Sequence, residues 1–181
     1  MIGEIKLTIW KMYRYEDSVL APKMVKTEEG VFVETQPVSS VSADSKADIV
    51  ELLKDSLQAD PEDASKEDLN YEIDVKDAQP VLLQVLGIKK WKDFEKRALM
   101  YTLHRSDNQL VMRVTGRGAD GMWSIADSES RNFSFENSLQ QICECIADEM
   151  IARRAVRAPL LLGGSSMVVR PDTTPEPKKE E

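Results

Sequence analysis

This chain has few of the residues that form metal sites and catalytic triads: it contains one histidine and two cysteines among 181 residues. With His104 alone, neither a cluster of metal-binding histidines nor a triad with a partner histidine can form. Cys143 and Cys145 stand two residues apart in a helical pattern, a spacing that suits neither a disulfide nor the usual zinc motifs. We therefore expect no metal and no cofactor, while a dyad of His104 with a cysteine or a serine stays open.

The chain also lacks long apolar runs, an export signal and an excess of basic charge. Apolar runs such as Leu160–Leu162 are far too short to span a bilayer, which takes about 20 residues. No basic region followed by an apolar stretch opens the sequence, as a signal peptide would. A formal net charge of −8 argues against binding to nucleic acid or an anionic membrane through bulk charge. Two thiols without an export signal predict a cytoplasmic protein.

Negative charge is concentrated between Asp44 and Asp77. This acidic segment contains twelve acidic residues, four lysines and no arginine, so its formal charge of −8 equals that of the whole chain. A local acidic field attracts basic partners and repels nucleic acid, although a solvated helix and loop without a partner is the alternative. We predict a partner-binding surface centred on seven of the carboxylates: Asp60, Glu62, Asp63, Glu67, Asp68, Glu72 and Asp74.

Alternation of apolar and polar residues predicts the strands. In residues 5–10, Ile5, Leu7 and Ile9 alternate with Lys6, Thr8 and Trp10, which predicts a half-buried strand with the first three side chains inward. Further strands are predicted over 31–35, 99–103, 110–114 and 122–126, and around Phe133 and Phe135. Residues 69–76 alternate as an edge strand or an extended segment, and the polar residues 58–68 predict an exposed loop.

Apolar residues at helical spacing predict the helices. Asp44 or Ser45 caps a helix that ends near Pro61, and Ser138 with Gln141 forms the capping box of a second, amphipathic helix. Their apolar stripes are Ile49, Val50, Leu53 and Leu57, and Leu139, Ile142, Cys143, Ile146 and Met150. A short helix over residues 90–98 places Trp91, Phe94 and Ala98 on one face, and residues 81–86 fit either a helix or a strand.

These elements predict one α+β domain over residues 1–157, with a largely antiparallel sheet and about three helices. Residues 158–181 contain Pro171, Pro175 and Pro177 and end in charged residues, which predicts a flexible tail. Within it, Leu160–Leu162 and Met167–Val169 are more apolar than a tail needs, and they either dock on the domain or bind a partner.

No assembled catalytic site emerges from these patterns. Residues 116–121 are rich in glycine but lack the Gly-Lys-Ser/Thr ending of a phosphate-binding loop, so we interpret them as a flexible hairpin loop. Cys143 lies on an apolar stripe, where a free cysteine behaves as a small buried hydrophobic residue. Carboxylates in an exposed loop are not buried, so nothing shifts the pKa of one away from that of another. We therefore do not expect acid-base catalysis by the acidic segment. A basic cluster is either a solvated face or a phosphate contact: Lys89, Lys90, Lys92, Lys96 and Arg97.

The segment Pro80–Phe94 carries a resemblance to a known family. In it an apolar stretch leads to Gly87, a lysine pair, Trp91 and then Phe94. This order resembles that of small bacterial immunity proteins of contact-dependent growth inhibition and related polymorphic toxin systems, and the likeness extends over residues 80–151. The resemblance implies a non-enzymatic inhibitor of a toxin domain, which is often a basic nuclease. Carboxylates of the inhibitor would then occupy the positions that substrate phosphates take in the toxin. The binding surface of that family varies with the toxin, so it implies no particular binding residues.

We therefore expect a cytoplasmic immunity protein that neutralises a cognate protein toxin by binding it, with no role for nucleic acid or membrane. The second interpretation, from another class, is a structural or adaptor protein of a phage or a secretion apparatus. An acidic domain with a proline-rich, charged tail suits that role equally well. An enzyme is the third interpretation, because the sequence shows no catalytic constellation.

Overall fold

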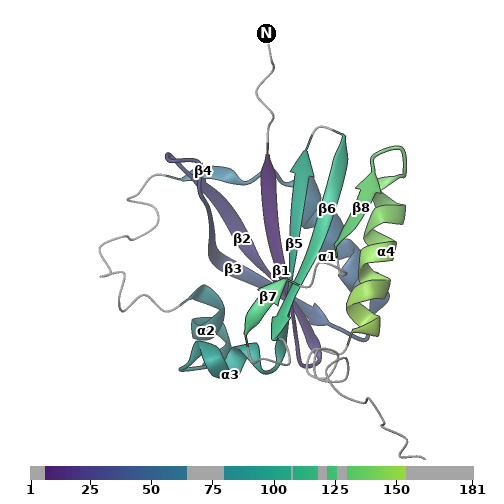
Figure 1. Cartoon of the computed structure of the whole chain (residues 1–181). Coiled ribbons are helices and arrows are strands. Elements are labelled where there is room, and N and C mark those ends of the chain that lie inside the picture. The colour runs from purple at the N-terminus through teal and green to yellow at the C-terminus, as the bar shows by residue number, and fades with distance from the viewer. Residues whose placement is uncertain (1–6, 65–79, 107, 118–121, 126–129, 154–181) are drawn as a thin grey trace, which may run out of the picture.

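Within the residues that the structure describes, the chain forms eight strands and four helices (Figure 1). The computed structural model describes residues 7–64, 80–106, 108–117, 122–125 and 130–153. The strands are β1 (Thr8–Tyr15), β2 (Ser18–Thr27), β3 (Phe32–Ser42), β4 (Glu62–Ala64), β5 (Ala98–Ser106), β6 (Gln109–Arg117), β7 (Trp123–Ile125) and β8 (Arg131–Ser134). The helices are α1 (Lys46–Gln58), α2 (Val81–Leu86), α3 (Trp91–Glu95) and α4 (Leu139–Ala152).

All the described strands belong to one sheet. Its main path runs β3-β2-β1-β5-β6-β7, while β8 also pairs with β6 and β4 with β2. Every pairing is antiparallel except that of β4 with β2, which is parallel. Hairpins join β1 to β2, β2 to β3, β5 to β6 and β6 to β7, whereas the antiparallel pairs β1–β5 and β6–β8 join strands that are not consecutive in the chain. The predicted single α+β domain with a largely antiparallel sheet is confirmed.

Helices α1 and α4 pack on one face of the sheet and form the main core. Figure 1 shows α1 behind the strands, with α4 beside it. The strands contribute every second residue to this core, as the alternation of side chains along a strand requires. Its buried members on β1, β5 and β6 are Trp10, Met12, Leu99, Tyr101, Leu103, Leu110, Met112 and Val114. The apolar stripes predicted for the two helices are buried against them, except for the half-buried Leu139.

Side-chain caps start both long helices where the sequence predicts. The N–H of Asp48 donates to the Ser45 hydroxyl, which makes Ser45 the N-cap of α1. At the start of α4, the N–H of Gln141 donates to Ser138 Oγ, and the Ser138 N–H donates to Gln141 Oε1 at 3.0 Å. Each cap satisfies backbone donors that the first turn of a helix leaves without an intrahelical acceptor.

Among the described elements, α2 and α3 cover the opposite face of the sheet at one end only. Gly87 ends α2 with a φ of 65°, a left-handed conformation that suits glycine because it has no Cβ. Phe94 on α3 is fully buried, and its ring lies 5.6 Å from that of Tyr13 and 5.4 Å from that of Tyr15. A second, smaller core therefore forms here, and the remainder of this face has no helix over it among the described elements.

Strands β1 and β2 pair only next to their connecting turn. The register joins Tyr13 to Leu20 and Tyr15 to Ser18, and it continues no further along β1. Farther along β2, residues 25–27 pair instead with β4. The two strands therefore diverge, and β4 lines the gap that opens between them, as Figure 1 shows. Through this pairing, residues 62–64 in the middle of the acidic segment become part of the sheet.

The structure corrects several expectations. In β1, Leu7 and Ile9 were expected inward, yet Leu7 is 47% exposed and Trp10 is 4% exposed. The face is inverted because Trp10 continues the row of Met12 under α1 and α4. Strand β2 was not predicted, since its central residues are buried on both faces and show no simple alternation.

Other corrections concern element boundaries. The predicted loop 58–68 contains β4, whose pairing with β2 is a backbone contact that side-chain polarity does not report. Gly116 and Arg117 belong to β6 rather than to a loop, because both pair with β7. Ala98 starts β5 instead of ending the short helix. The predicted strand over 69–76 and the predicted tail 158–181 lie outside the described residues.

We predict that Ile142 and Ile146 hold α4 on the sheet. Both side chains are at most 1% exposed, so replacing either by alanine should lower the free energy of unfolding by about 2–5 kcal/mol. Chemical denaturation of the two variants measures this loss. Gln140→Ala, on the exposed side of the same helix, should change stability by less than about 0.5 kcal/mol. Equal stability of all three variants would mean that α4 is not held by these side chains.

Candidate functional site

A stripe of carboxylates follows the exposed side of α1. Asp48, Glu51 and Asp55 are three and four residues apart, so they share one side of the helix, and all three are exposed. None of them forms an ion pair within the described residues. The acidic segment thus presents part of its charge on a rigid element. The helical spacing of these three residues is the sequence signal that could have placed them in the predicted surface, which was centred instead on the loop after α1.

Three of the seven predicted binding residues are described. All three are exposed: Asp60 lies just before β4, and Glu62 and Asp63 are its first two residues. Lys23 on β2 pairs with Glu62 at 2.7 Å, so part of the local charge is neutralised within the protein. Asp60 and Glu62 also line a small hollow of about 120 Å³ that reaches Trp10 between the diverging strands. The other four residues, Glu67, Asp68, Glu72 and Asp74, lie outside the described part of the chain, so their placement stays a prediction.

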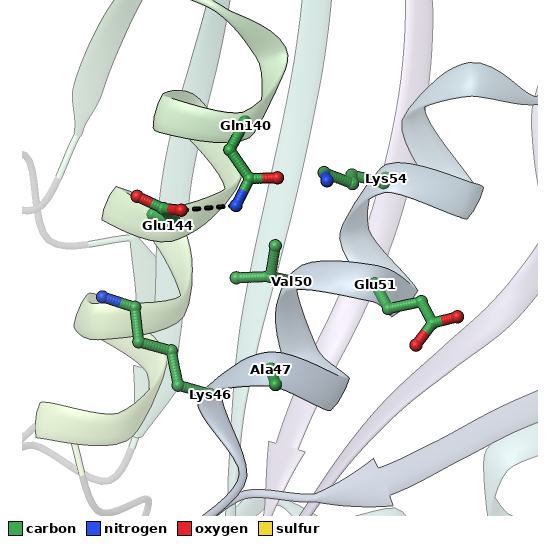
Figure 2. A pocket seen from close by; sticks show the side chains of 7 residues that line it. All are labelled: Lys46, Ala47, Val50, Glu51, Lys54, Gln140 and Glu144. Carbon is green, nitrogen blue, oxygen red and sulfur yellow. Dashed lines mark hydrogen bonds between the residues drawn. The ribbon is translucent and has the colours of Figure 1, made fainter.

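A groove runs between α1 and α4 on the outer surface (Figure 2). It encloses about 730 Å³ and is lined by Lys46, Ala47, Val50, Glu51, Lys54, Gln140 and Glu144. Figure 2 shows Val50 between the two helices and Glu51 pointing away from α4. The groove therefore has a small apolar base and charged walls.

Ion pairs and hydrogen bonds organise the walls of this groove. Lys46 Nζ reaches from α1 to Asp148 Oδ1 on α4 at 2.6 Å, and the Gln140 side-chain amide donates to Glu144. The hydrogen bond with Asp148 raises the pKa of Lys46 above its ordinary value, so the lysine stays charged. Exposed pairs of this kind contribute little to stability, because solvent screens them. The arrangement offers charge complementarity to a binding partner, but it contains no nucleophile next to a general base.

The cysteine and histidine that sequence analysis left open for catalysis do not meet. Cys143 is fully buried in the main core with Leu103, whereas the next residue along β5, His104, points to the opposite face of the sheet. Burial raises the pKa of the Cys143 thiol to about 11, which keeps it protonated and a poor nucleophile. Cys145 is exposed, because two residues along a helix the side chain points to a different side. A Cys143–His104 dyad is therefore excluded by the geometry.

No group of three or more histidine, cysteine, aspartate or glutamate side chains among the described residues is arranged to hold a metal ion. No helix in the described part of the chain combines the length and apolar character needed to cross a bilayer.

The face of the sheet opposite α1 and α4 carries both apolar and polar side chains in register across β1, β5 and β6. Ile9, His104 and Val111 form one row across three strands, and Lys11, Thr102 and Arg113 form the next. At the edge of this face, Tyr13 donates to Glu34 Oε1 at 2.6 Å, and Lys11 Nζ lies 3.1 Å from the same oxygen. Burial, followed by the Glu34 carboxylate, raises the pKa of Tyr13 above its ordinary value. The phenol is thus a structural hydrogen-bond donor rather than an acid that ionises near neutral pH.

The basic cluster at α3 is a solvated face with local partners. Its five side chains, Lys89, Lys90, Lys92, Lys96 and Arg97, are all exposed. Lys96 pairs with Asp93 at 3.2 Å, and Arg97 pairs with Glu16 at 2.8 Å. Both carboxylates lie outside the acidic segment, so among the described residues this cluster does not neutralise that segment.

Comparison with solved structures shows likeness of fold. The chain matches a protein of unknown function from Neisseria meningitidis with a TM-score of 0.56 and 13% sequence identity, over 83% of this chain and 96% of that one. It also matches a chain of the CdiA-CT/CdiI toxin and immunity complex from Yersinia pseudotuberculosis, with a TM-score of 0.54 and 15% identity, over 84% of this chain and 99% of that one. No protein-family model matches the sequence, and no curated protein matches it either.

These comparisons support the suspected resemblance at the level of the fold. The likeness to the second structure covers almost the whole of that chain, so the complete domain is shared rather than a fragment. The residues that carry the sequence resemblance have structural positions: Gly87 ends α2, and Phe94 packs against Trp91, with 4.9 Å between the ring centres. Phe94 and Trp91 thus belong to the smaller core, and Gly87 ends the helix that contributes Leu82 and Leu83 to it.

We predict that His104 makes the protein less stable at acidic pH. Burial, together with the nearby charge of Arg113, lowers the pKa of His104 below its ordinary value of 6.5. The unfolded chain then takes up a proton more readily than the folded one, so stability is present above pH 6.5 and declines as the pH falls through the folded-state pKa. Denaturation of wild type and His104→Gln across this range isolates the contribution, because only the wild type should show it.

Thr102→Ala provides the control for this comparison. Thr102 lies two residues from His104 on the same face of β5, but its side chain does not titrate. Its difference in stability from wild type should be constant with pH. A constant difference for His104→Gln as well would contradict the predicted role of the histidine.

Proposed function

We propose that this chain is a non-enzymatic immunity protein that binds and neutralises a cognate bacterial toxin domain in the cytoplasm. The observation that carries the proposal is the full-length likeness of its fold to a chain of a toxin and immunity complex. The order of residues in Pro80–Phe94, which resembles that of such immunity proteins, supports the same assignment from the sequence side.

The chemistry of the described surface suits binding better than catalysis. Cys143 is buried in the core and separated by the sheet from His104, and the groove between α1 and α4 has charged walls without a nucleophile and base in contact. The exposed side of α1 carries a carboxylate stripe. An immunity protein needs only a complementary surface, and acidic groups complement a toxin that binds nucleic acid phosphates. The partner we propose is therefore a basic protein, and a nuclease domain fits this requirement.

Co-expression tests the proposal directly. Cells that produce the toxin domain encoded next to this chain should survive only when this chain is produced with it. A tag on either protein should then purify both. Cell death despite soluble expression of this chain, together with no co-purification, would rule out the assigned function.

We predict that the part of the acidic segment after α1 accelerates association with this partner. Asp63→Lys combined with Asp68→Lys should lower the association rate on the order of tenfold at low salt, because steering by charge acts on the rate of encounter. The loss should shrink at physiological ionic strength, where the screening length is about 8 Å. Stopped-flow or surface-based kinetics at several salt concentrations measures both effects.

A matched double variant, Asp17→Lys with Glu28→Lys, changes the net charge equally at exposed positions outside the acidic segment. If this variant slows association as much as the Asp63 and Asp68 variant does, total charge rather than the acidic segment sets the rate. An unchanged rate for the Asp63 and Asp68 variant at low salt would refute the predicted centre of the binding surface.

A further inference from the structure

An apolar pocket opens at the end of the sheet where the C-terminal end of α1 approaches the start of α4. It encloses about 270 Å³ and is lined by Trp10, Leu57, Gln58, Arg105, Leu110, Phe135 and Leu139. Trp10 and Leu110 are buried at its base, whereas Phe135, just beyond β8, is 39% exposed. The predicted binding surface in the acidic segment does not include any of these residues. The pocket is therefore a separate surface feature.

The walls of the pocket are held in place by contacts within the protein. The Trp10 indole N–H donates to the carbonyl of Ala59 at 3.3 Å, which fixes the indole just after the end of α1. Leu110 is paired with Arg105 on β5 and with Phe133 on β8, so three strands hold the opposite wall. The pocket is thus formed before a partner arrives, and binding does not have to order its walls.

Arg105 gives the rim of this pocket a defined chemistry. Its guanidinium carbon lies 5.6 Å from the centre of the Phe135 ring, an arrangement in which the cation rests on the aromatic face. Arg105 is exposed, and no described carboxylate lies within ion-pairing distance of it. A positive group next to an apolar hollow is complementary to an acidic group next to an apolar one.

The size of the pocket limits what enters it. Pockets that enclose a small-molecule ligand usually measure about 300–1,000 Å³, so this one is too small for most of them and suits one or two inserted side chains. Arginine and aromatic residues around a preformed hollow are also the composition of binding hot spots between proteins.

We propose that this pocket receives a large apolar side chain of the cognate toxin, with a neighbouring Asp or Glu of the toxin paired to Arg105. This inference rests on the proposed function and adds a second contact of opposite character to the acidic surface. The acidic surface sets the rate of encounter, whereas the pocket sets the lifetime of the complex, because desolvated anchors act mainly on dissociation.

The test compares charge reversals on two arginines. Arg105→Glu should weaken binding of the co-purified toxin domain about 30-fold, the loss expected of a hot-spot residue, mainly through faster dissociation. Phe135→Ala, which removes the ring under the guanidinium, should weaken it in the same direction. Arg113→Glu is the matched control, since Arg113 is also exposed, lies on the adjacent strand and has no described carboxylate partner, but belongs to the open face of the sheet. Its affinity should stay within about threefold of wild type.

The outcomes separate this inference from the proposed function. If wild type binds no toxin domain, the function fails and the pocket assignment fails with it. If wild type binds and Arg105→Glu binds equally well, only the pocket assignment is wrong, and the same holds if Arg113→Glu alone loses affinity. A changed elution volume of free Phe135→Ala or Arg105→Glu would show that a second copy of this chain fills the pocket, which also overturns it. Hydrogen exchange of the wild-type complex supplies an independent measurement, in which β8 and the first turn of α4 should become protected.

Discussion

The packing of α1 and α4 against one face of the sheet is the constraint on which the remaining structure depends. Ile49 and Leu53 of α1 and Ile146 of α4 are completely buried, together with Tyr101 and Leu103 of β5. Close-packed interiors leave little freedom to rotate or shift an element without opening a void. Once these apolar stripes face the sheet, the other sides of the helices must face solvent. The carboxylate stripe of α1 and the groove between the helices follow from this packing.

The two faces of the sheet differ in how they are covered by helices. Within the described part of the chain, the face under α1 and α4 supplies most of the buried apolar surface, whereas α2 and α3 cover only one end of the other face. Because β1 and β2 diverge beyond their turn, β4 can pair with β2 and anchor the chain just after the α1 carboxylates. The rim of the sheet next to Trp10 is then left as a pocket rather than being filled by a neighbouring strand. Surface hollows suited to partner binding therefore arise where the regular pairing between strands ends.

Local sequence patterns were sufficient to predict the two long helices, α1 and α4. Ser45 and Ser138 act as N-caps because a hydroxyl at that position accepts from the backbone two or three residues ahead, an interaction confined to one turn. The stripe that includes Ile142 and Ile146 was read correctly for the same reason, since helical spacing depends on neighbours along the chain. The inward face of β1 was read wrongly. Ile9 and Trp10 are both apolar, and only the positions of α1 and α4 decide which one lies under the helices.

The sequence by itself therefore determined the fold class, the long helices with their caps, and the concentration of negative charge between Asp44 and Asp77. Each of these depends on composition or on residues a few positions apart. Only the tertiary structure decided that Cys143 and His104 lie on opposite sides of the sheet, that Glu62 pairs with Lys23, and that Arg105 meets Phe135 beside an apolar pocket. These contacts join residues that are distant in the chain. Their geometry is set by strand register and by how the helices pack, which no local pattern encodes.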